Sequence, residues 1–295
     1  MNQDQFEKIT HGNGLIAALD QSGGSTPAAL ARYGISHSGY NDDDEMFDLM
    51  HEMRTRIIAD PSFSGDRILA TILFEDTIDR QIDGIDSAGY VWGRKRVVPF
   101  LKVDKGLASE TDGVRCMKPM PDLDALLEKA VRKGIFGTKM RSFIQIADSA
   151  GVQAVVDQQF EIAHRICATG LVPILEPEVD ITSPEKQAAE NLLRDALANH
   201  LDQLDPDEHV MLKLTLPEQG DLYAPLMEQP NVLRVAALSG GYSREEATGR
   251  LARNHGMIAS FSRALTEGLK VTMSDAEFSA ELHTSIEQIY AASIT

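Results

Sequence analysis

Eight short apolar runs, most of them followed by a segment whose apolar residues recur at helical spacing, mark out this 295-residue sequence. An apolar run of about four to eight residues between turn residues is typical of a strand covered on both faces. Strands that alternate with helices pair in parallel, because each helix returns the chain to the same edge of the sheet. The predicted strands span residues 15–19, 68–74, 97–103, 135–139, 172–175, 210–214, 233–238 and 257–261.

The repeated strand and helix units predict a closed α/β barrel. Eight such units close a barrel more readily than they extend an open sheet, and a (β/α)8 TIM barrel needs about 250 residues. No segment of low complexity divides the chain, so we expect residues 1–295 to form a single domain. Ser183, Ser243 and Ser274 stand where helix N-caps are expected, the last two in sequences that fit a capping box.

Charge and composition narrow the possible partners. The formal net charge of −17 repels phosphate backbones and anionic lipid headgroups, so nucleic acid and membranes are poor partners. An anionic ligand therefore needs a local cationic site. Cys116 and Cys167 belong to no paired motif, as expected in a reducing compartment, and no apolar run approaches the roughly 18 residues of a membrane span. We expect a cytoplasmic protein; the sequence leaves a homo-oligomer open.

Lys213 interrupts the apolar run at residues 210–214. Removal from water favours the neutral form of a lysine, and a neutral amine can attack a carbonyl to form a Schiff base. A lysine in this position can also snorkel to the strand end or pair with a carboxylate. Its neighbours decide between these interpretations.

The fifth predicted strand runs into Glu176 and Glu178, which should face one way because they are two residues apart. Two carboxylates in a partly dry cleft do not both ionise easily, so one is driven towards use as a proton donor; the alternative is a surface turn. In a closed barrel Glu176 would lie between Lys139, which ends the fourth strand, and Lys213. A second cation lowers the pKa of a lysine, and a carboxyl group beside it can shuttle protons. Arg141 follows on the same side as Lys139.

Two anion sites are expected at the carboxyl ends of other strands. After the first strand, Asp20 precedes a turn containing Ser22 and Ser25, which can offer backbone N–H groups to an anion or can be an ordinary capped loop. Lys102 and Asp104 end the third strand on one side, as an inward pair or a surface pair.

The loops after strands seven and eight form the second expected anion site. They contain Ser239, Gly240, Gly241 and Arg263, and loops at this place in a barrel recurrently bind phosphate. The glycine N–H groups and a bidentate arginine are suitable donors. No paired-histidine motif for a divalent metal is present, since the segment after His51 lacks a second histidine, so we expect a mechanism without metal.

Together these segments resemble the class I fructose-1,6-bisphosphate aldolases, with the compact bacterial branch most similar, and the resemblance spans almost the whole chain. The matching segments are Ala17-Ala-Leu-Asp-Gln-Ser22, Leu101-Lys-Val-Asp-Lys-Gly106, Phe136-Gly-Thr-Lys-Met-Arg141, Val172-Pro-Ile-Leu-Glu-Pro-Glu178, Leu212-Lys213, Leu238-Ser-Gly-Gly241 and Ser260-Phe-Ser-Arg-Ala-Leu265.

The resemblance implies a role for each matching residue. It implies that Lys213 is the Schiff-base lysine, with Glu176 as the acid/base, Glu178 and Lys139 as its electrostatic partners and Asp20 near the bond that breaks. The phosphate nearer the ketone would be held by Ser239, Gly240 and Arg263, and the distal phosphate by Lys102, Ser22 and Ser25, with Gly241 and Arg141 in the same substrate site. An arginine that the animal enzymes place after the first loop aligns near Ala29, and Arg32 is close by.

The activity implied by the resemblance is that of a lyase. It is the reversible cleavage of fructose 1,6-bisphosphate to dihydroxyacetone phosphate and glyceraldehyde 3-phosphate in glycolysis and gluconeogenesis, with no cofactor beyond the imine on Lys213. Sugar phosphates would be its small-molecule partners. Two alternatives stay open: a Schiff-base aldolase for another sugar phosphate, and a non-catalytic role in sugar-phosphate binding or adhesion.

Overall fold

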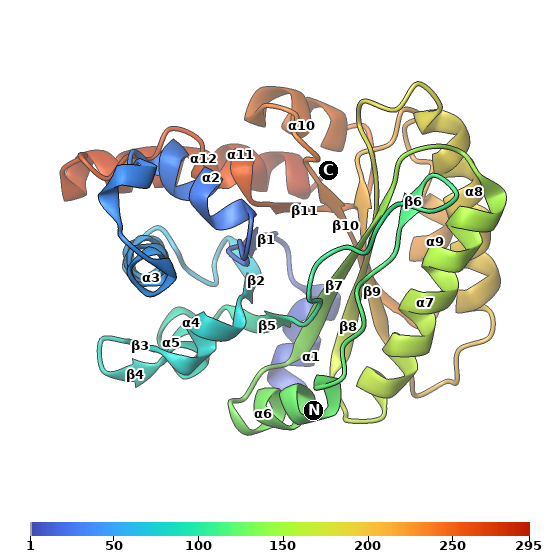
Figure 1. Cartoon of the computed structure of the whole chain (residues 1–295), viewed down its shortest axis with the longest axis horizontal. Helices are drawn as coiled ribbons and strands as arrows, with labels where there is room; N and C mark the ends of the chain where they lie inside the picture. Colours follow the sequence, from blue (N-terminus) through green and yellow to red (C-terminus); the bar gives the residue numbers. More distant parts are fainter. Residues whose placement is uncertain (1) are drawn as a thin grey trace.

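A computed structural model describes residues 2–295, and it contains a closed barrel of eight parallel strands (Figure 1). Around the barrel the order is β1, β2, β5, β7, β8, β9, β10, β11 and back to β1, with the pairing of β5 and β7 completing the ring. The strands are β1 (Leu15–Ala18), β2 (Ile68–Leu73), β5 (Val98–Lys102), β7 (Gly137–Ile144), β8 (Val172–Val179), β9 (Val210–Thr215), β10 (Val232–Leu238) and β11 (Ile258–Phe261). The predicted TIM barrel is confirmed.

All eight predicted strands are found, but two of them extend several residues beyond their predicted ends. β7 and β8 continue past Lys139 and Leu175 and remain paired as far as Ile144 and Val179. The sequence pattern ended these strands early because polar residues begin there. In the structure those polar side chains lie inside the barrel, so polarity marks a change of surroundings and not the end of the strand.

Helices alternate with the strands, and short elements interrupt some connections (Figure 1). The longer helices are α1 (Gln3–His11), α2 (Ser25–Tyr33), α3 (Asp43–Ala59), α5 (Ser87–Lys95), α6 (Leu123–Arg132), α7 (Ser149–Cys167), α8 (Lys186–Leu201), α10 (Arg244–Leu251) and α12 (Asp275–Ser293). The short elements are η1 (His37–Gly39), α4 (Glu75–Asp79), α9 (Ala224–Met227), α11 (Arg263–Thr266), the antiparallel pair β3 (Gln81–Ile82) and β4 (Ile85–Asp86), and β6 (Val114–Arg115), which pairs antiparallel with β7.

The predicted helix caps are partly found. Ser274 makes a complete capping box with Glu277, and the Ser243 side chain accepts a hydrogen bond from the N–H of Glu246. The Ser183 cap was wrong, because α8 begins later, at Lys186. The hydroxyl of Ser183 instead accepts from the N–H of Glu185 at 3.2 Å within a preceding turn.

Two apolar layers hold the barrel together. The larger one lies between the outward-facing strand residues and the surrounding helices, and includes Leu15, Ala17 and Leu212. The smaller one includes Ile16 and Met211, fills the barrel interior, and is closed by side chains of α1. Successive strand residues alternate between the two layers, as the pleat requires.

Candidate active site

Because side chains alternate along a strand, the predicted site residues on β8 and β9 point into the barrel. Met211 belongs to the interior apolar layer, so Lys213, two residues further along β9, points the same way. Ile174 is likewise interior, and Glu176 and Glu178 follow it on β8 at the same spacing. The carboxyl half of the barrel interior therefore carries charged side chains above an apolar floor.

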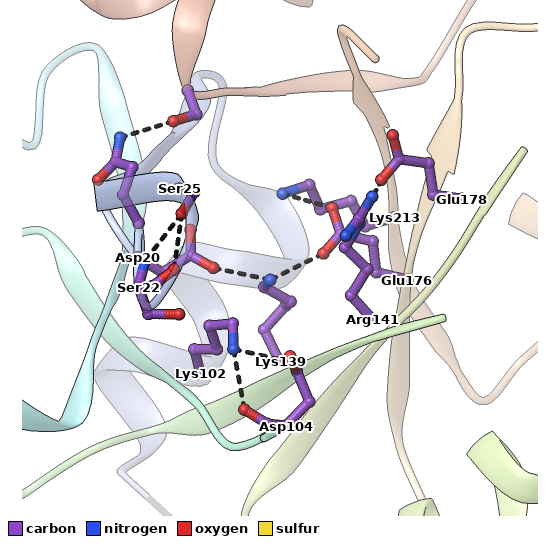
Figure 2. Close-up of polar contacts among 12 residues, drawn as sticks. Asp20, Ser22, Ser25, Lys102, Asp104, Lys139, Arg141, Glu176, Glu178 and Lys213 are labelled. Atoms are coloured by element: carbon purple, nitrogen blue, oxygen red, sulfur yellow. Dashed lines mark hydrogen bonds and ion pairs between the residues drawn. The ribbon is translucent and has the colours of Figure 1, made fainter. Parts of the chain in front are cut away.

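Four of these side chains form a continuous chain of ion pairs (Figure 2). Lys213 Nζ lies 2.9 Å from Glu176 Oε1, and Lys139 Nζ lies 2.8 Å from Glu176 Oε2. Lys139 Nζ is also 2.7 Å from Asp20 Oδ2. The arrangement expected from the strand order, with Glu176 between the two lysines, is thus present. All four residues are buried, with exposures of 9% or less.

The pKa shifts in this chain follow from burial and the neighbouring charges. Burial alone would raise the pKa of Glu176, but Lys139 and Lys213 lower it below its usual value. The pKa of Asp20 is also held well below its usual range, because Lys139 and Lys213 outweigh burial. For Lys139, burial is outweighed by Asp20 and Glu176, which raise its pKa. Glu176 is therefore held in its charged carboxylate form beside the Lys213 amine.

Glu178 pairs with Arg141 and not with either buried lysine. Arg141 Nε donates to Glu178 Oε2 across the two paired strands (Figure 2). Burial raises the pKa of Glu178, although Arg141 opposes the shift. The pKa values of the two carboxylates therefore shift in opposite directions, and it is the pKa of Glu178 that is raised.

A cavity of about 570 Å³ opens above the ion-pair chain. Of the thirteen predicted catalytic and substrate-binding residues, all but Gly241 border it. Seven basic and four acidic side chains line the cavity, so its wall is locally positive in a chain whose net charge is −17. A site of this size and charge suits a small polyanionic molecule.

One end of the cavity is formed by the turn after β10 and by Arg263. Gly240 has a left-handed φ of +59°, and a Cβ there would lie 2.5 Å from the side chain of Ile181. Gly241, at φ +134°, brings its backbone against the Arg263 guanidinium, whose Nη2 would lie 3.4 Å from a Cβ at that position. The turn thus needs glycine and places a guanidinium beside backbone N–H groups.

Another part of the wall contains Lys102 and the turn after β1. Lys102 Nζ donates to the carbonyl and to Oδ1 of Asp104, at 2.8 Å each, so the pair faces inward as one of the two expected arrangements (Figure 2). The Ser25 hydroxyl accepts from the N–H of Ser22 and donates to its carbonyl, both at 2.9 Å. These serines border the cavity and also close their own turn.

Sequence reasoning did not single out some residues at the site. Arg115, Ser260 and Ser262 border the cavity. Gln21 also lines the cavity, and its Nε2 donates to Ser262 Oγ at 2.7 Å, which ties the loop after β1 to the loop after β11. These residues carry no local signal, because each becomes part of the site only through loops from distant segments.

Arg54 was also missed, although the sequence holds a signal for it. It is fully buried on α3, where its guanidinium donates to the carbonyl of Gln21 and, at 2.9 Å, to Thr77 Oγ1. Burial lowers the pKa of Arg54 to about 10, although Asp20 opposes the shift. An arginine on the apolar face defined by Met50 and Ile57 indicates a buried polar contact.

Two features that would indicate other classes of site are absent from residues 2–295. No group of three or more histidine, cysteine, aspartate or glutamate side chains in this part of the chain is arranged to hold a metal ion. Within the same residues, no helix is long and apolar enough to span a bilayer.

Comparison with solved structures gives an independent check of the fold. Fructose-bisphosphate aldolase from Plasmodium falciparum, solved in complex with TRAP and a small-molecule inhibitor, superposes with a TM-score of 0.76. The match covers 98% of this chain and 93% of that one at 20% sequence identity, so it supports the barrel fold alone.

Sequence comparisons go further than the fold. The family model for class-I fructose-bisphosphate aldolase matches residues 5–219. Proteins named fructose-bisphosphate aldolase class 1 are 63% identical in Synechocystis sp., 54% in Clostridium acetobutylicum and 52% in Porphyromonas gingivalis. Each match covers 100% of this chain and at least 98% of the relative. The chain therefore belongs to the class I fructose-bisphosphate aldolases, the lyases that act through a lysine Schiff base and need no metal.

Proposed function

We propose that Lys213 forms the Schiff base in the reversible cleavage of fructose 1,6-bisphosphate to dihydroxyacetone phosphate and glyceraldehyde 3-phosphate. The observation that carries this assignment is the buried ion-pair chain of Lys213, Glu176, Lys139 and Asp20 beside a positively lined cavity. Family membership supports the aldolase activity, and the geometry supports the residue roles.

The first half of the reaction uses Glu176 twice. Its carboxylate accepts a proton from Lys213, and the neutral amine attacks the ketone carbon of the substrate. A proton then passes from the nitrogen to the new alkoxide oxygen, which gives the carbinolamine. The resulting carbinolamine loses water when the protonated Glu176 returns its proton to the departing hydroxyl. The 2.9 Å contact between Lys213 Nζ and Glu176 Oε1 places both groups within range of these transfers.

The second half uses the iminium as an electron sink. Asp20 accepts the proton of the hydroxyl on the fourth carbon, the bond between the third and fourth carbons breaks, and its electrons neutralise the iminium to give an enamine. Glyceraldehyde 3-phosphate leaves at this point. Protonation and hydrolysis of the enamine then release dihydroxyacetone phosphate and restore the Lys213 amine. Lys139, paired with both Asp20 and Glu176, stabilises their carboxylates between steps.

The proposal extends to the substrate contacts and to the setting of the enzyme. Ser239, Gly240 and Arg263 would hold the phosphate nearer the ketone, and Lys102 the distal one. We also propose that residues 1–295 act as one catalytic domain and that the enzyme works in the cytoplasm.

Borohydride trapping tests the assignment of Lys213. Reduction in the presence of dihydroxyacetone phosphate should add the ligand irreversibly to one peptide, the one containing Lys213, as measured by mass spectrometry. The exposed Lys118 offers a matched control: Lys118→Met should label as the wild type does, and Lys213→Met should not label. Labelling of a different lysine would overturn the assignment, and absence of labelling in the wild type would overturn the Schiff-base mechanism for this chain.

A further inference from the structure

Basic side chains outnumber acidic ones in the cavity wall, and the basic side chains without a carboxylate partner in residues 2–295 are all arginines. Four basic side chains there have carboxylate partners: Lys102, Lys139, Arg141 and Lys213. The guanidinium groups of Arg32, Arg115 and Arg263 line the same cavity and form no ion pair with a carboxylate within residues 2–295. Three positive charges are therefore left for a ligand, and Arg32 and Arg115 have no part in the proposed mechanism.

Arg115 is better positioned for a ligand than Arg32. It lies on β6, and its Nε donates to the carbonyl of Ala108 at 2.9 Å, which leaves both terminal nitrogens without a hydrogen bond to residues 2–295. It is half-buried, whereas Arg32 is exposed and its side chain makes no hydrogen bond to that part of the chain. A guanidinium that is already oriented loses less conformational entropy when it binds an anion.

The backbone around Arg115 is also fixed. The excursion between β5 and α6 folds back on itself, with the Ala108 N–H donating to the carbonyl of Cys116 at 2.8 Å and the Lys118 N–H to that of Gly106 at 3.0 Å. β6 then pairs with β7, where Arg115 lies opposite Phe143. Arg115 is thus carried on paired strands and not on a free loop.

Barrel topology places Arg115 across the cavity from Arg263. Arg115 stands on the excursion between β5 and β7, the third and fourth strands of the ring, while Arg263 follows β11, the eighth. Strands four positions apart in an eight-stranded barrel are diametrically opposed. Lys102, the proposed ligand of the distal phosphate, lies on the same side as Arg115, and its charge is already balanced by Asp104. Arg115 is therefore the unpaired cation on that side.

We propose that Arg115 is a specificity-determining residue whose terminal nitrogens bind the second, distal phosphate of the substrate. This role makes the enzyme prefer a ketose with two phosphates over a ketose with one. The inference rests on the proposed function, because it takes the first phosphate to bind near Ser239 and Arg263.

Arg115→Gln tests the proposal with two substrates. For fructose 1,6-bisphosphate we expect kcat/KM to fall by about 10- to 100-fold, the range for loss of a hydrogen bond to a charged group. For fructose 1-phosphate, which lacks the distal phosphate, kcat/KM should stay within about two-fold. Arg253→Gln is the charge-matched control, because the exposed Arg253 lies between α10 and β11 at the amino end of the barrel, and it should change neither value.

A conservative variant separates phosphate binding from support of the fold. Arg115→Lys keeps the charge and should recover part of the lost bisphosphate activity. Equal losses on both substrates would show that Arg115 only supports the fold, and no loss on either would show that it does not contact the phosphate; both results overturn the proposal. Borohydride labelling by dihydroxyacetone phosphate should persist in Arg115→Gln, so failure of this inference is distinguishable from failure of the proposed function.

Discussion

Two buried lysine and glutamate clusters lie in different parts of this molecule, and only one of them borders the cavity. Lys213 pairs with Glu176 inside the barrel, whereas Lys186 pairs with Glu190 on α8, outside it. Lys213 and Lys186 are each only 4% exposed. Lys186 also donates to the carbonyl of Leu216 at 2.8 Å and lies 3.1 Å from Glu218 Oε1, so its ammonium is fully occupied.

The comparison teaches that burial and ion pairing do not identify a reactive lysine. Lys186 and its partners do not border the cavity, and the hydrogen bond from Lys186 to the carbonyl of Leu216 joins α8 to the segment after β9. The Lys213 cluster faces about 570 Å³ of accessible space. A buried lysine becomes a candidate nucleophile when a substrate can reach it and a base lies beside it.

The largest expected difference between the clusters is in turnover. Lys213→Met should lower kcat by roughly 10⁴-fold or more, because no other group can form the imine. Binding of inorganic phosphate should persist, and the thermal unfolding midpoint should stay near that of the wild type, since Glu176 keeps Lys139 as a partner. Steady-state kinetics and calorimetry measure both. Substantial residual turnover would refute the assignment.

Lys186→Met should have the opposite effect, on stability alone. It leaves the Glu190 carboxylate buried with only the N–H of Glu218 as a partner, and breaking a buried pair in this way costs about 3–5 kcal/mol. Denaturant unfolding measures this loss, while kcat per folded molecule should not change. The matched control is the double variant Lys186→Met, Glu190→Leu, which should regain much of the stability. A large loss of kcat in correctly folded Lys186→Met would show that the Lys186 cluster also takes part in turnover, contrary to this prediction.

The smallest expected difference is in the response to acid. Lys139 and Lys213 outweigh burial and lower the pKa of Glu176, so its charged form stabilises the fold above the unfolded pKa of about 4.3, and this stability is lost as the pH falls. Burial raises the pKa of Glu190 in spite of Lys186, so the folded state binds its proton more tightly and gains stability as the pH falls.

Glutamine variants measure the two slopes. The unfolding free energy lost by Glu176→Gln should be nearly constant down to about pH 4.3 and shrink below it, and that lost by Glu190→Gln should grow as the pH falls from about 7 to about 4.3. Denaturant unfolding of the wild type at each pH is the reference. Parallel slopes for the two variants would show that the carboxylates do not differ in this way.

The barrel was predictable because strand and helix signals are local. Each predicted strand was found because an apolar run of the right length stands on its own in the sequence. The place of Lys213 inside the barrel was inferred from Glu176 and Lys139 on the neighbouring strands, because a run that is apolar on both faces does not by itself show which face is inside. The ends of β7 and β8 were not predictable, because their polar residues face a cavity whose existence depends on the closed ring.

The partners of the site residues were predictable only where they lie on adjacent strands. Strand order in a closed barrel placed Glu176 between Lys139 and Lys213, and the structure has this arrangement. In the register of β7 and β8 Arg141 lies opposite Glu176, yet its guanidinium pairs diagonally with Glu178, a choice that the sequence leaves open. Arg115 could not be found, because its place at the cavity depends on an excursion that folds back and pairs with β7.

The sequence by itself therefore determined the barrel, which residues of a strand share a face, and the set of groups capable of imine chemistry. These follow from short-range periodicity and from the order of strands around a ring. Only the tertiary structure decided which charges pair beyond Lys139, Glu176 and Lys213, which arginines remain unpaired and which buried lysine meets open space. Those properties depend on distances between segments far apart in the chain, and such distances are fixed only when the ring closes and its loops pack over the carboxyl ends of the strands.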